Sequence, residues 1–115
     1  MAVMPSTGAK ETDICVVINS WHKQITGKGC GHARSKVLGN MLVIEMSGFL
    51  TKHEETLTTT TEGAETVRRL REVVIRNNRE DLEEAVSKHM ERTCHFLVYK
   101  LDQDFGKATL VMILD

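Results

Sequence analysis

The sequence predicts a single α+β domain in which an α-β-β unit occurs twice, giving the element order α-β-β-α-β-β. Two observations carry this prediction. Apolar residues recur at helical spacing in two separate segments, and each segment is followed by two short β-type runs that turn residues separate. A chain of 115 residues is long enough for one hydrophobic core and short for two. We therefore expect a four-stranded antiparallel sheet with two helices packed on one face.

Composition and charge exclude several classes of protein. Hydrophobic residues make up 41% and charged residues 27%, which is ordinary globular usage and argues against disorder or a fibrous repeat. The net charge of -1 gives no overall attraction to nucleic acid or to an anionic membrane. No apolar run approaches the roughly 20 residues that span a bilayer, and the start lacks the layout of a secretory signal. We expect a cytoplasmic protein with no direct membrane insertion, and its three widely spaced cysteines should be free thiols.

The first unit begins at about Ala9, after residues 1–8, which are small and polar and are expected to be flexible. Its helix should end near Thr26, because several glycines follow. The predicted inner face of this helix consists of Ile14, Val17, Ile18, Trp21 and Ile25. Residues 32–38 and 41–47 are predicted strands, since the Gly-Asn pair between them is typical of a tight hairpin.

The second unit follows a polar connector and contains the longest helical pattern. Thr59 and Glu62 have the spacing of a capping box, so we expect a helix from about Thr60 to Met90. Weak helix propensity at Asn77-Asn78 predicts a bend or break. The expected inner face carries Val67, Leu70, Val74, then Asp81 or Leu82, Ala85 or Val86, and His89 or Met90. Residues 94–101 and 108–114 form the second predicted hairpin, with turn residues at 102–107.

The face of the sheet that the helices do not cover is expected to be partly apolar. Because side chains alternate along a strand, it would carry Val43, Val111 and Ile113 together with charged residues such as Glu45. An exposed apolar area of this kind suggests a homodimer interface.

The glycine-rich segment after the first helix is the most inviting binding feature. Its backbone N–H groups and nearby cationic side chains could hold a small anion such as bicarbonate, carbonate or phosphate. The candidate residues are Gly27, Lys28, Gly29, His32 and Arg34. A phosphate loop, however, normally follows a strand and opens a helix, whereas this segment follows a helix and opens a strand. The interpretation as a simple helix terminus is therefore favoured.

No catalytic or metal-binding set is assembled along the sequence. A turn that Glu54 caps or braces is favoured over a metal or acid–base site at His53-Glu54-Glu55, because no second histidine lies at helical spacing. Cys30, near His32, is the one candidate thiol nucleophile, and a free thiol is the favoured interpretation. Arginines between residues 68 and 79 alternate with acidic residues, which indicates a solvated helix face and not a nucleic-acid footprint. We expect no catalytic residue, no metal and no cofactor.

An ordered set of residues runs from the glycine segment into the second helix. It begins with Gly27-x-Gly29 and the first hairpin, and its later members are Gly48, Leu50, Thr51, Glu54, Leu57, Glu62, Gly63 and Arg71. Taken together, residues from about Asp13 to Asp115 resemble the MpsC-like family of small bacterial proteins. Two positions depart from its pattern, since Cys30 stands where members usually have proline and Cys94 where they usually have glycine.

The resemblance implies a soluble accessory or regulatory partner of membrane transport components, in a family named for sodium-translocating, membrane-potential-generating systems linked to inorganic-carbon uptake. The leading hypothesis is therefore a non-enzymatic, cytoplasmic, homodimeric interaction module that assists a membrane ion or inorganic-carbon transport system. The alternative is a small-anion or metabolite-sensing domain that uses the segment from Gly27 to Arg34. A small enzyme ranks third, and a nucleic-acid-binding protein ranks fourth.

Overall fold

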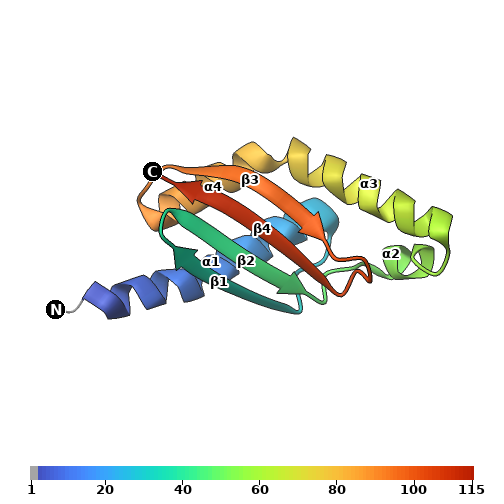
Figure 1. Ribbon diagram of the computed structural model, residues 1–115, viewed down its shortest axis with the longest axis horizontal. Helices are drawn as coiled ribbons and strands as arrows, with labels where there is room; N and C mark the ends of the chain where they lie inside the picture. Colours follow the sequence, from blue (N-terminus) through green and yellow to red (C-terminus); the bar gives the residue numbers. More distant parts are fainter. Residues whose placement is uncertain (1–2) are drawn as a thin grey trace.

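The computed structural model describes residues 3–115, with side chains from residue 13 onward. In order, its elements are α1 (Val3–Thr26), β1 (His32–Leu38), β2 (Met41–Ser47), α2 (Lys52–Leu57), α3 (Thr61–Asn77), α4 (Arg79–Met90), β3 (Cys94–Leu101) and β4 (Lys107–Leu114). Figure 1 shows the sheet crossing in front of the helices.

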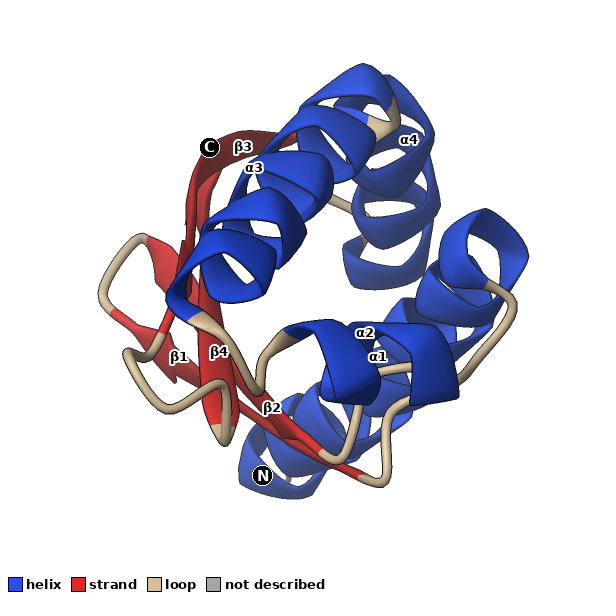
Figure 2. Cartoon of the chain, turned by 90° about the vertical axis from the view of Figure 1, so that its right-hand side faces the viewer, coloured by secondary structure: helices blue, strands red, loops and turns tan. Residues whose placement is uncertain are grey.

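The strands form one antiparallel sheet in the order β1-β2-β4-β3. Each hairpin supplies one edge strand and one central strand, and the central strands join the hairpins by pairing residues 41–47 with residues 107–113. The helices of the described chain lie on one face of this sheet, as the turned view in Figure 2 makes clear. The fold therefore has two layers, and the outer face of the sheet is left without a helix in the described residues.

The hydrophobic core lies between the inner face of the sheet and the helices. Alternate residues of the central strands supply one side of it: Leu42, Ile44, Met46, Ala108, Leu110, Met112 and Leu114. The helices supply the other side with Ile14, Ile18, Trp21, Val67, Ile75, Leu82 and Val86. Each buried Val, Leu, Ile or Met side chain among them contributes about 1.5–3 kcal/mol relative to an exposed one, so the matching periods of strand and helix hold the layers together.

The predicted fold class and the order of the predicted elements are confirmed. Strands β1, β2 and β3 have the predicted bounds, and β4 begins one residue early, at Lys107. The predicted break in the long helix is also confirmed, because Asn78 separates α3 from α4. Its side-chain amide donates to the carbonyl of Val74 at 2.7 Å, and its backbone N–H donates to Ile75. These bonds end α3 while α4 begins one residue later.

The helices differ from the prediction in number and in one boundary. α1 begins at Val3 and not at about Ala9, so residues 3–8, which were expected to be flexible, continue this helix, while Met1 and Ala2 lie outside the described residues. Pro5 is compatible with this start, since the first turn of a helix needs no N–H donor there. The polar connector contains the short helix α2, which makes four described helices in place of the expected two.

The capping box expected at Thr59 and Glu62 is wrong. Thr60 is the N-cap residue of α3, and its hydroxyl oxygen accepts a hydrogen bond from the backbone N–H of Gly63 at 3.0 Å. A glycine has no side chain to reciprocate, so no capping box forms there. The capping box of this region lies at the start of α2, where Thr51 and Glu54 bond each other's backbone N–H groups.

The predicted inner face of α3 is also partly wrong. Leu70 was expected to be buried but is 47% exposed, while Arg71, expected on the solvated face, is only 2% exposed. The buried stripe runs instead through Val67, Arg71 and Ile75, at intervals of four residues. A charged residue can occupy this stripe because a buried carboxylate pairs with it.

Candidate functional site

A buried polar network forms where α1, α2, α3 and β3 meet. At its centre, the guanidinium of Arg71 lies 4.8 Å from the centre of the Phe49 ring. Its Nε and Nη2 donate to the two carboxylate oxygens of Glu54, at 2.8 and 2.7 Å. Two parallel hydrogen bonds between a guanidinium and a carboxylate are shorter and stronger than neutral ones. The pair therefore fixes α2 against α3.

The remaining N–H groups of Arg71 are used inside the protein as well. Nη2 donates to the carbonyl of Phe49 at 3.0 Å, and Nη1 reaches His22 Nε2 at 2.9 Å and the Tyr99 hydroxyl at 3.5 Å. Together with the two bonds to Glu54, these contacts occupy every N–H of the guanidinium. Arg71 consequently has no donor left for a ligand.

His22 lies on the buried face of α1 and links the network to the glycine segment. Because an arginine can only donate, His22 Nε2 must accept the hydrogen bond from Arg71. The proton of the neutral ring is then on Nδ1, which lies 2.5 Å from the carbonyl oxygen of Lys28 and donates to it. Burial, assisted by the charge of Arg71, lowers the pKa of His22 below its usual value. The ring is therefore held neutral.

Glu54 is ionised in this setting. Burial alone would raise the pKa of Glu54, but hydrogen bonds from Arg71 and from the backbone of Thr51 outweigh burial and lower it. Burial likewise opposes the charge of Arg71, and the hydrogen bond to Glu54 outweighs it, so the pKa of Arg71 is raised. The Tyr99 hydroxyl stays protonated, because burial raises its pKa. The network is thus one ion pair with two neutral partners.

The glycine segment is held by bonds within the protein. Its backbone N–H groups bond as follows: Gly27 to the carbonyl of Lys23, Lys28 to the hydroxyl of Thr26, Cys30 to the side-chain oxygen of Asn19, and Gly31 to the carbonyl of Gly48. The Lys28 ammonium donates to the carbonyl of Leu50 at 2.8 Å. Gly29 lies so close to Asn19 that a Cβ would stand 2.5 Å from its Oδ1. These contacts tie the end of α1 to the connector and occupy most of the backbone N–H groups that an anion would need.

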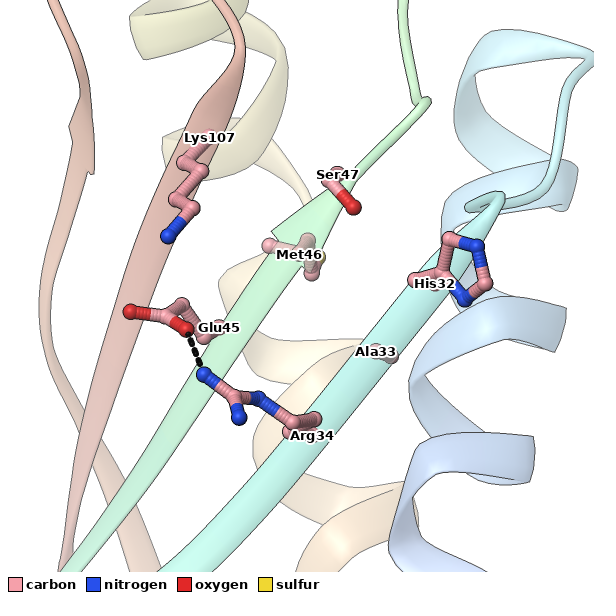
Figure 3. Close-up of a pocket in the computed structure, with 7 residues that line it drawn as sticks. All are labelled: His32, Ala33, Arg34, Glu45, Met46, Ser47 and Lys107. Atoms are coloured by element: carbon pink, nitrogen blue, oxygen red, sulfur yellow. Dashed lines mark hydrogen bonds and ion pairs between the residues drawn. The ribbon is translucent and has the colours of Figure 1, made fainter.

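The other two residues of the predicted anion site, His32 and Arg34, lie on the outer face of β1. They line a hollow of about 290 Å³ together with Glu45, Ser47 and Lys107. Figure 3 shows Arg34 bonded to Glu45 across the two strands, at 2.7 Å, with Lys107 beyond Glu45 on the next strand. Lys28 is not among the lining residues. The structure therefore separates the predicted set into the loop of Gly27, Lys28 and Gly29 and this surface hollow.

The outer face of the sheet divides into an apolar half and a charged half. Cross-strand pairing aligns Leu38, Met41, Ile113 and His95 in one row, and Lys36, Val43, Val111 and Val98 in the next. The following rows contain Arg34, Glu45, Thr109 and Lys100, then His32, Ser47 and Lys107. We define the apolar half as Leu38, Met41, Val43, Val98, Val111 and Ile113; the polar members of its two rows, Lys36 and His95, lie on the edge strands. The predicted placement of Val43, Val111 and Ile113 on one face follows from this pairing.

Most of the singled-out connector residues have a task within the fold. Gly48 has a φ of +65° and lies against Gly31, and Gly63 lies so close to the carbonyl of Leu57 that a Cβ would stand 1.8 Å from its oxygen. Leu50 packs on the core, and Glu62 lies exposed in the first turn of α3. Thr51, Glu54 and Arg71 form the capping box and ion pair described above. Leu57 differs, because 41% of it is exposed.

A second hollow, of about 260 Å³, opens between the end of α1, α2 and α3. We call it the helix pocket. Its apolar wall consists of Ile25, Leu57, Leu70, Val74 and Ile75, and its polar lining consists of Thr26, Thr51, His53, Glu54 and Arg71. Four of the singled-out residues, Thr51, Glu54, Leu57 and Arg71, therefore line the same pocket. The sequence places them up to 20 positions apart, and only the packing of α2 on α3 brings them together.

The surroundings of the remaining candidates for catalysis and metal binding do not support these roles. Burial raises the pKa of Cys30 to about 11, which disfavours the thiolate that a nucleophile needs. Glu54 caps α2 as one interpretation of His53-Glu54-Glu55 predicted, although it is buried and not solvated. Within the described residues, no group of three or more His, Cys, Asp or Glu side chains could hold a metal ion. None of the described helices is long and apolar enough to cross a membrane.

Sequence reasoning missed two members of the buried network, His22 and Tyr99. A signal for His22 was present, because it continues the stripe of Ile14 and Ile18 at intervals of four residues. Arg71 has the same relation to Val67. A polar residue in line with a buried stripe indicates a paired core group. Tyr99 carries no comparable signal, since its neighbours in the network are distant in sequence.

Comparison with known proteins places the chain in a family. The family described as "Na+-translocating membrane potential-generating system (MpsC)" matches residues 6–115. One relative, "Uncharacterized protein YbcI" of Bacillus subtilis (strain 168), is 25% identical over 83 residues, which cover 72% of this chain and 67% of the relative. No solved structure gives a significant match.

Proposed function

Because the chain belongs to the MpsC family, we propose that it is a non-enzymatic accessory or regulatory module of a membrane ion or inorganic-carbon transport system. The proposal places the protein in the cytoplasm as a homodimer. The family description names a membrane-potential-generating system. In the buried network, every N–H group of Arg71 is already bonded within the protein. An interaction role fits these residues better than catalysis.

The observation that carries the interaction role is the apolar half of the outer sheet face. Val43 and Val111 are directly paired across the two central strands, and Met41 and Ile113 are paired in the neighbouring row. Leu38 and Val98 extend the apolar half toward the two edge strands, and they are 47% and 44% exposed. A contiguous apolar area on a sheet that carries no helix is typical of a protein interface. A second copy of the chain offers the matching apolar surface.

The size of this face limits the strength of the dimer. Four strands spaced about 4.8 Å apart, each seven or eight residues long, present a face of roughly 20 by 25 Å. Two such faces together approach the roughly 1,000 Å² that a specific interface needs. The apolar half alone covers about half of this area. We therefore expect a weak dimer that dissociates in the micromolar range.

Symmetry decides which parts of the face meet. Two copies can pack face to face only about a two-fold axis that lies in the plane of the interface. If the axis runs across the strands through the apolar half, apolar residues meet and the charged halves project at opposite ends. The cations of the charged half, Arg34, Lys100 and Lys107, then avoid those of the other copy, and Lys36 lies at the edge of the contact, on β1. This arrangement leaves the charged half accessible in the dimer.

Sedimentation velocity over increasing concentration tests the homodimer. We expect a concentration-dependent dimer for the natural chain and a monomer for Val111→Arg, which places a charge in the centre of the apolar half. Val16→Arg is the matched control, because Val16 lies on α1 and is already 68% exposed. The expected dissociation constant is micromolar, so a natural chain that stays monomeric at about 100 μM would contradict the homodimer.

The transport link needs a separate experiment. Affinity-tagged protein, cross-linked in the cells that naturally produce it, should enrich subunits of an ion or inorganic-carbon transporter above a tagged unrelated protein. Enrichment of no membrane component at all would contradict the link and leave the dimer untouched.

The alternative function is the sensing of a small anion, and the hollow lined by His32, Arg34 and Lys107 favours it. Arg34 and Lys107 bring positive charge to the hollow, and Glu45 is the one acidic residue in its lining. Titration with bicarbonate and with phosphate should then shift amide signals of residues 32–34 and 107, and Arg34→Gln should abolish the shifts. A specific ligand would also raise the melting temperature. Unmoved signals in both titrations would exclude this alternative.

A further inference from the structure

We propose that the helix pocket binds one bulky apolar side chain, aromatic by preference, from a partner polypeptide. The pocket lies between α1, α2 and α3, on the helical layer and away from the outer sheet face. Its occupant would therefore not compete with the homodimer. The proposal does not depend on the transport role or on self-association.

The polar lining of the pocket determines the chemical class of the occupant. Arg71 and Glu54 satisfy each other, and no buried side-chain nitrogen or oxygen among the described residues lacks a hydrogen-bond partner. An anion entering the pocket would meet the carboxylate of Glu54 and find no free donor on Arg71. A cation would meet the guanidinium and find both carboxylate oxygens occupied. Burying an unpaired charge is costly, so an uncharged apolar group is the favoured occupant.

The size of the pocket fits a single side chain. A closed apolar cavity of about 150 Å³ holds benzene, so an open pocket of about 260 Å³ has room for a phenyl or indole group. Sites for free small molecules usually measure about 300–1,000 Å³ and enclose most of the ligand. The helix pocket is smaller than this range. It has the dimensions of an anchor site within a larger contact.

Exposed apolar residues around the mouth indicate that the larger contact is with a polypeptide. Leu57 on α2 and Leu70 on α3 line the pocket yet remain 41% and 47% exposed, and Val73, on the next turn of α3, is 37% exposed. A ring seated in the pocket would leave Val73 uncovered. A segment of chain that places one ring in the pocket could cover all three residues, which is the arrangement of a central anchor with a surrounding rim.

The floor of the pocket is also preformed. The capping box of Thr51 and Glu54 sets the position of α2, and the ion pair with Arg71 fixes α2 to α3. The close approach of Gly63 to Leu57 holds the turn between these helices. A partner side chain would thus enter a site whose shape does not have to be ordered on binding, which favours affinity.

A first experiment measures the chemical preference with capped amino acids. Amide and methyl signals of the isotope-labelled protein are followed during titration with N-acetyl-tryptophanamide, N-acetyl-leucinamide and N-acetyl-glutamate amide. We expect shifts confined to residues 25–26, 51–57 and 70–75, largest for the indole compound and absent for the glutamate compound. The absence of shifts at the solubility limit of the indole compound, or shifts centred on the outer sheet face, would overturn the proposal.

A second experiment distinguishes a polypeptide partner from a small molecule. Peptides of twelve residues are selected from a random display library on the immobilised protein. We expect selected peptides that share one aromatic residue and bind at least about tenfold more tightly than N-acetyl-tryptophanamide. Peptides that bind no more tightly than the capped amino acid would identify a small-molecule site and overturn the assignment of a polypeptide.

Three variants connect these results to the pocket. Leu70→Ser should weaken the selected peptides by about fivefold or more, because Leu70 forms part of the rim. Val74→Phe should block them by filling the pocket while keeping the surface apolar. Val16→Ser, on the exposed face of α1, should change nothing. Binding that survives both Leu70→Ser and Val74→Phe would overturn the proposal, and either variant suffices if the other fails to fold.

Discussion

At the scale of single residues, the buried pair of Arg71 and Glu54 shows why a charge can occupy the core of this small domain. Removing two charges from water is expensive, and only close hydrogen bonding makes their burial tolerable. Here the guanidinium also bonds Phe49, His22 and Tyr99, so it connects segments that are distant along the chain. The pair therefore specifies how α2 and α3 dock more than it adds net stability.

Removal of the Glu54 charge should destabilise the protein strongly. Glu54→Gln keeps the size and one acceptor but leaves the Arg71 charge uncompensated, and we expect a loss of about 3 kcal/mol in the free energy of unfolding. Urea unfolding measures the loss, with Glu55→Gln, exposed on the same helix, as the control. The double variant Glu54→Leu/Arg71→Met should lose much less. If the single variant is as stable as the control, the pair does not hold the joint.

Protonation of His22 should lower the stability of the protein as the pH decreases. The pKa of His22 is lowered in the folded state by burial and by Arg71, so the unfolded chain binds the proton more readily. This contribution is fully present above the ordinary value of 6.5 and is lost as the pH falls from there toward the folded pKa. Glu54, with its lowered pKa, has its own window below its ordinary value of 4.5. The histidine window therefore begins at a higher pH than the Glu54 window.

Urea unfolding between pH 7 and pH 5 measures how the free energy of unfolding depends on pH. The variant His22→Gln, which has no titrating group at this position, is the comparison. We expect the natural chain to lose stability steadily as the pH falls below 6.5, and the variant to show a shallower slope. The charged groups that face His22 are Arg71, Glu54 and Lys28. Equal slopes for the two proteins would show that His22 does not carry the dependence.

At the scale of elements, the turn between α2 and α3 depends on the absence of a side chain at Gly63. This glycine lies within a helix, where alanine is normally favoured by about 1 kcal/mol. In this turn, however, the added Cβ would stand 1.8 Å from the carbonyl oxygen of Leu57. The two helices would have to separate, which would also strain the ion pair.

Gly63→Ala should therefore destabilise the protein, against the usual helical trend. We expect a loss of roughly 2–4 kcal/mol, comparable to other cases of overpacking with backbone shift. Thermal unfolding provides the measurement, and Thr61→Ala, in the same exposed turn, is the control. An increase in melting temperature for Gly63→Ala would contradict the close packing of α2 on α3.

The elements that the sequence predicted well are those with local signals. The hairpin turns at Gly39-Asn40 and at residues 102–106 carry turn residues, and β1, β2 and β3 begin and end as predicted. α2 was missed because six residues are too few to show helical periodicity. The sequence predicted Leu70 to be buried and Arg71 to be exposed, and the structure shows the opposite. A run of arginines normally marks a solvated face, and Arg71 is buried only because Glu54, which is distant in sequence, pairs with it.

The candidate sites show the same limit. Thr51, Glu54, Leu57 and Arg71 were singled out in the sequence, but no spacing rule places them around one pocket. That grouping depends on the angle at which α2 packs on α3. The glycine segment was identified as a possible anion site from its residue types, whereas its N–H groups are mostly used to bind α1 and the connector. Partners distant in sequence decide both cases.

At the scale of the whole molecule, the protein has two surfaces with different properties. The outer sheet face is divided into apolar and charged halves, and the helical layer carries the helix pocket with its preformed floor. In the proposed assembly, the first surface joins two copies and the second recognises a partner. A dimer would then present two pockets and two charged halves, which raises the apparent affinity for a partner with repeated motifs.

The proposed interface is tested most directly by contacts between copies. An equal mixture of isotope-labelled and unlabelled protein, at a concentration where sedimentation reports dimer, permits measurement of nuclear Overhauser effects that arise only between copies. We predict such effects among the methyl groups of Val43, Val111 and Ile113, and none in a mixture of the Val111→Arg variant. Effects that arise instead from residues of α1, α3 or α4 would contradict the outer sheet face as the interface.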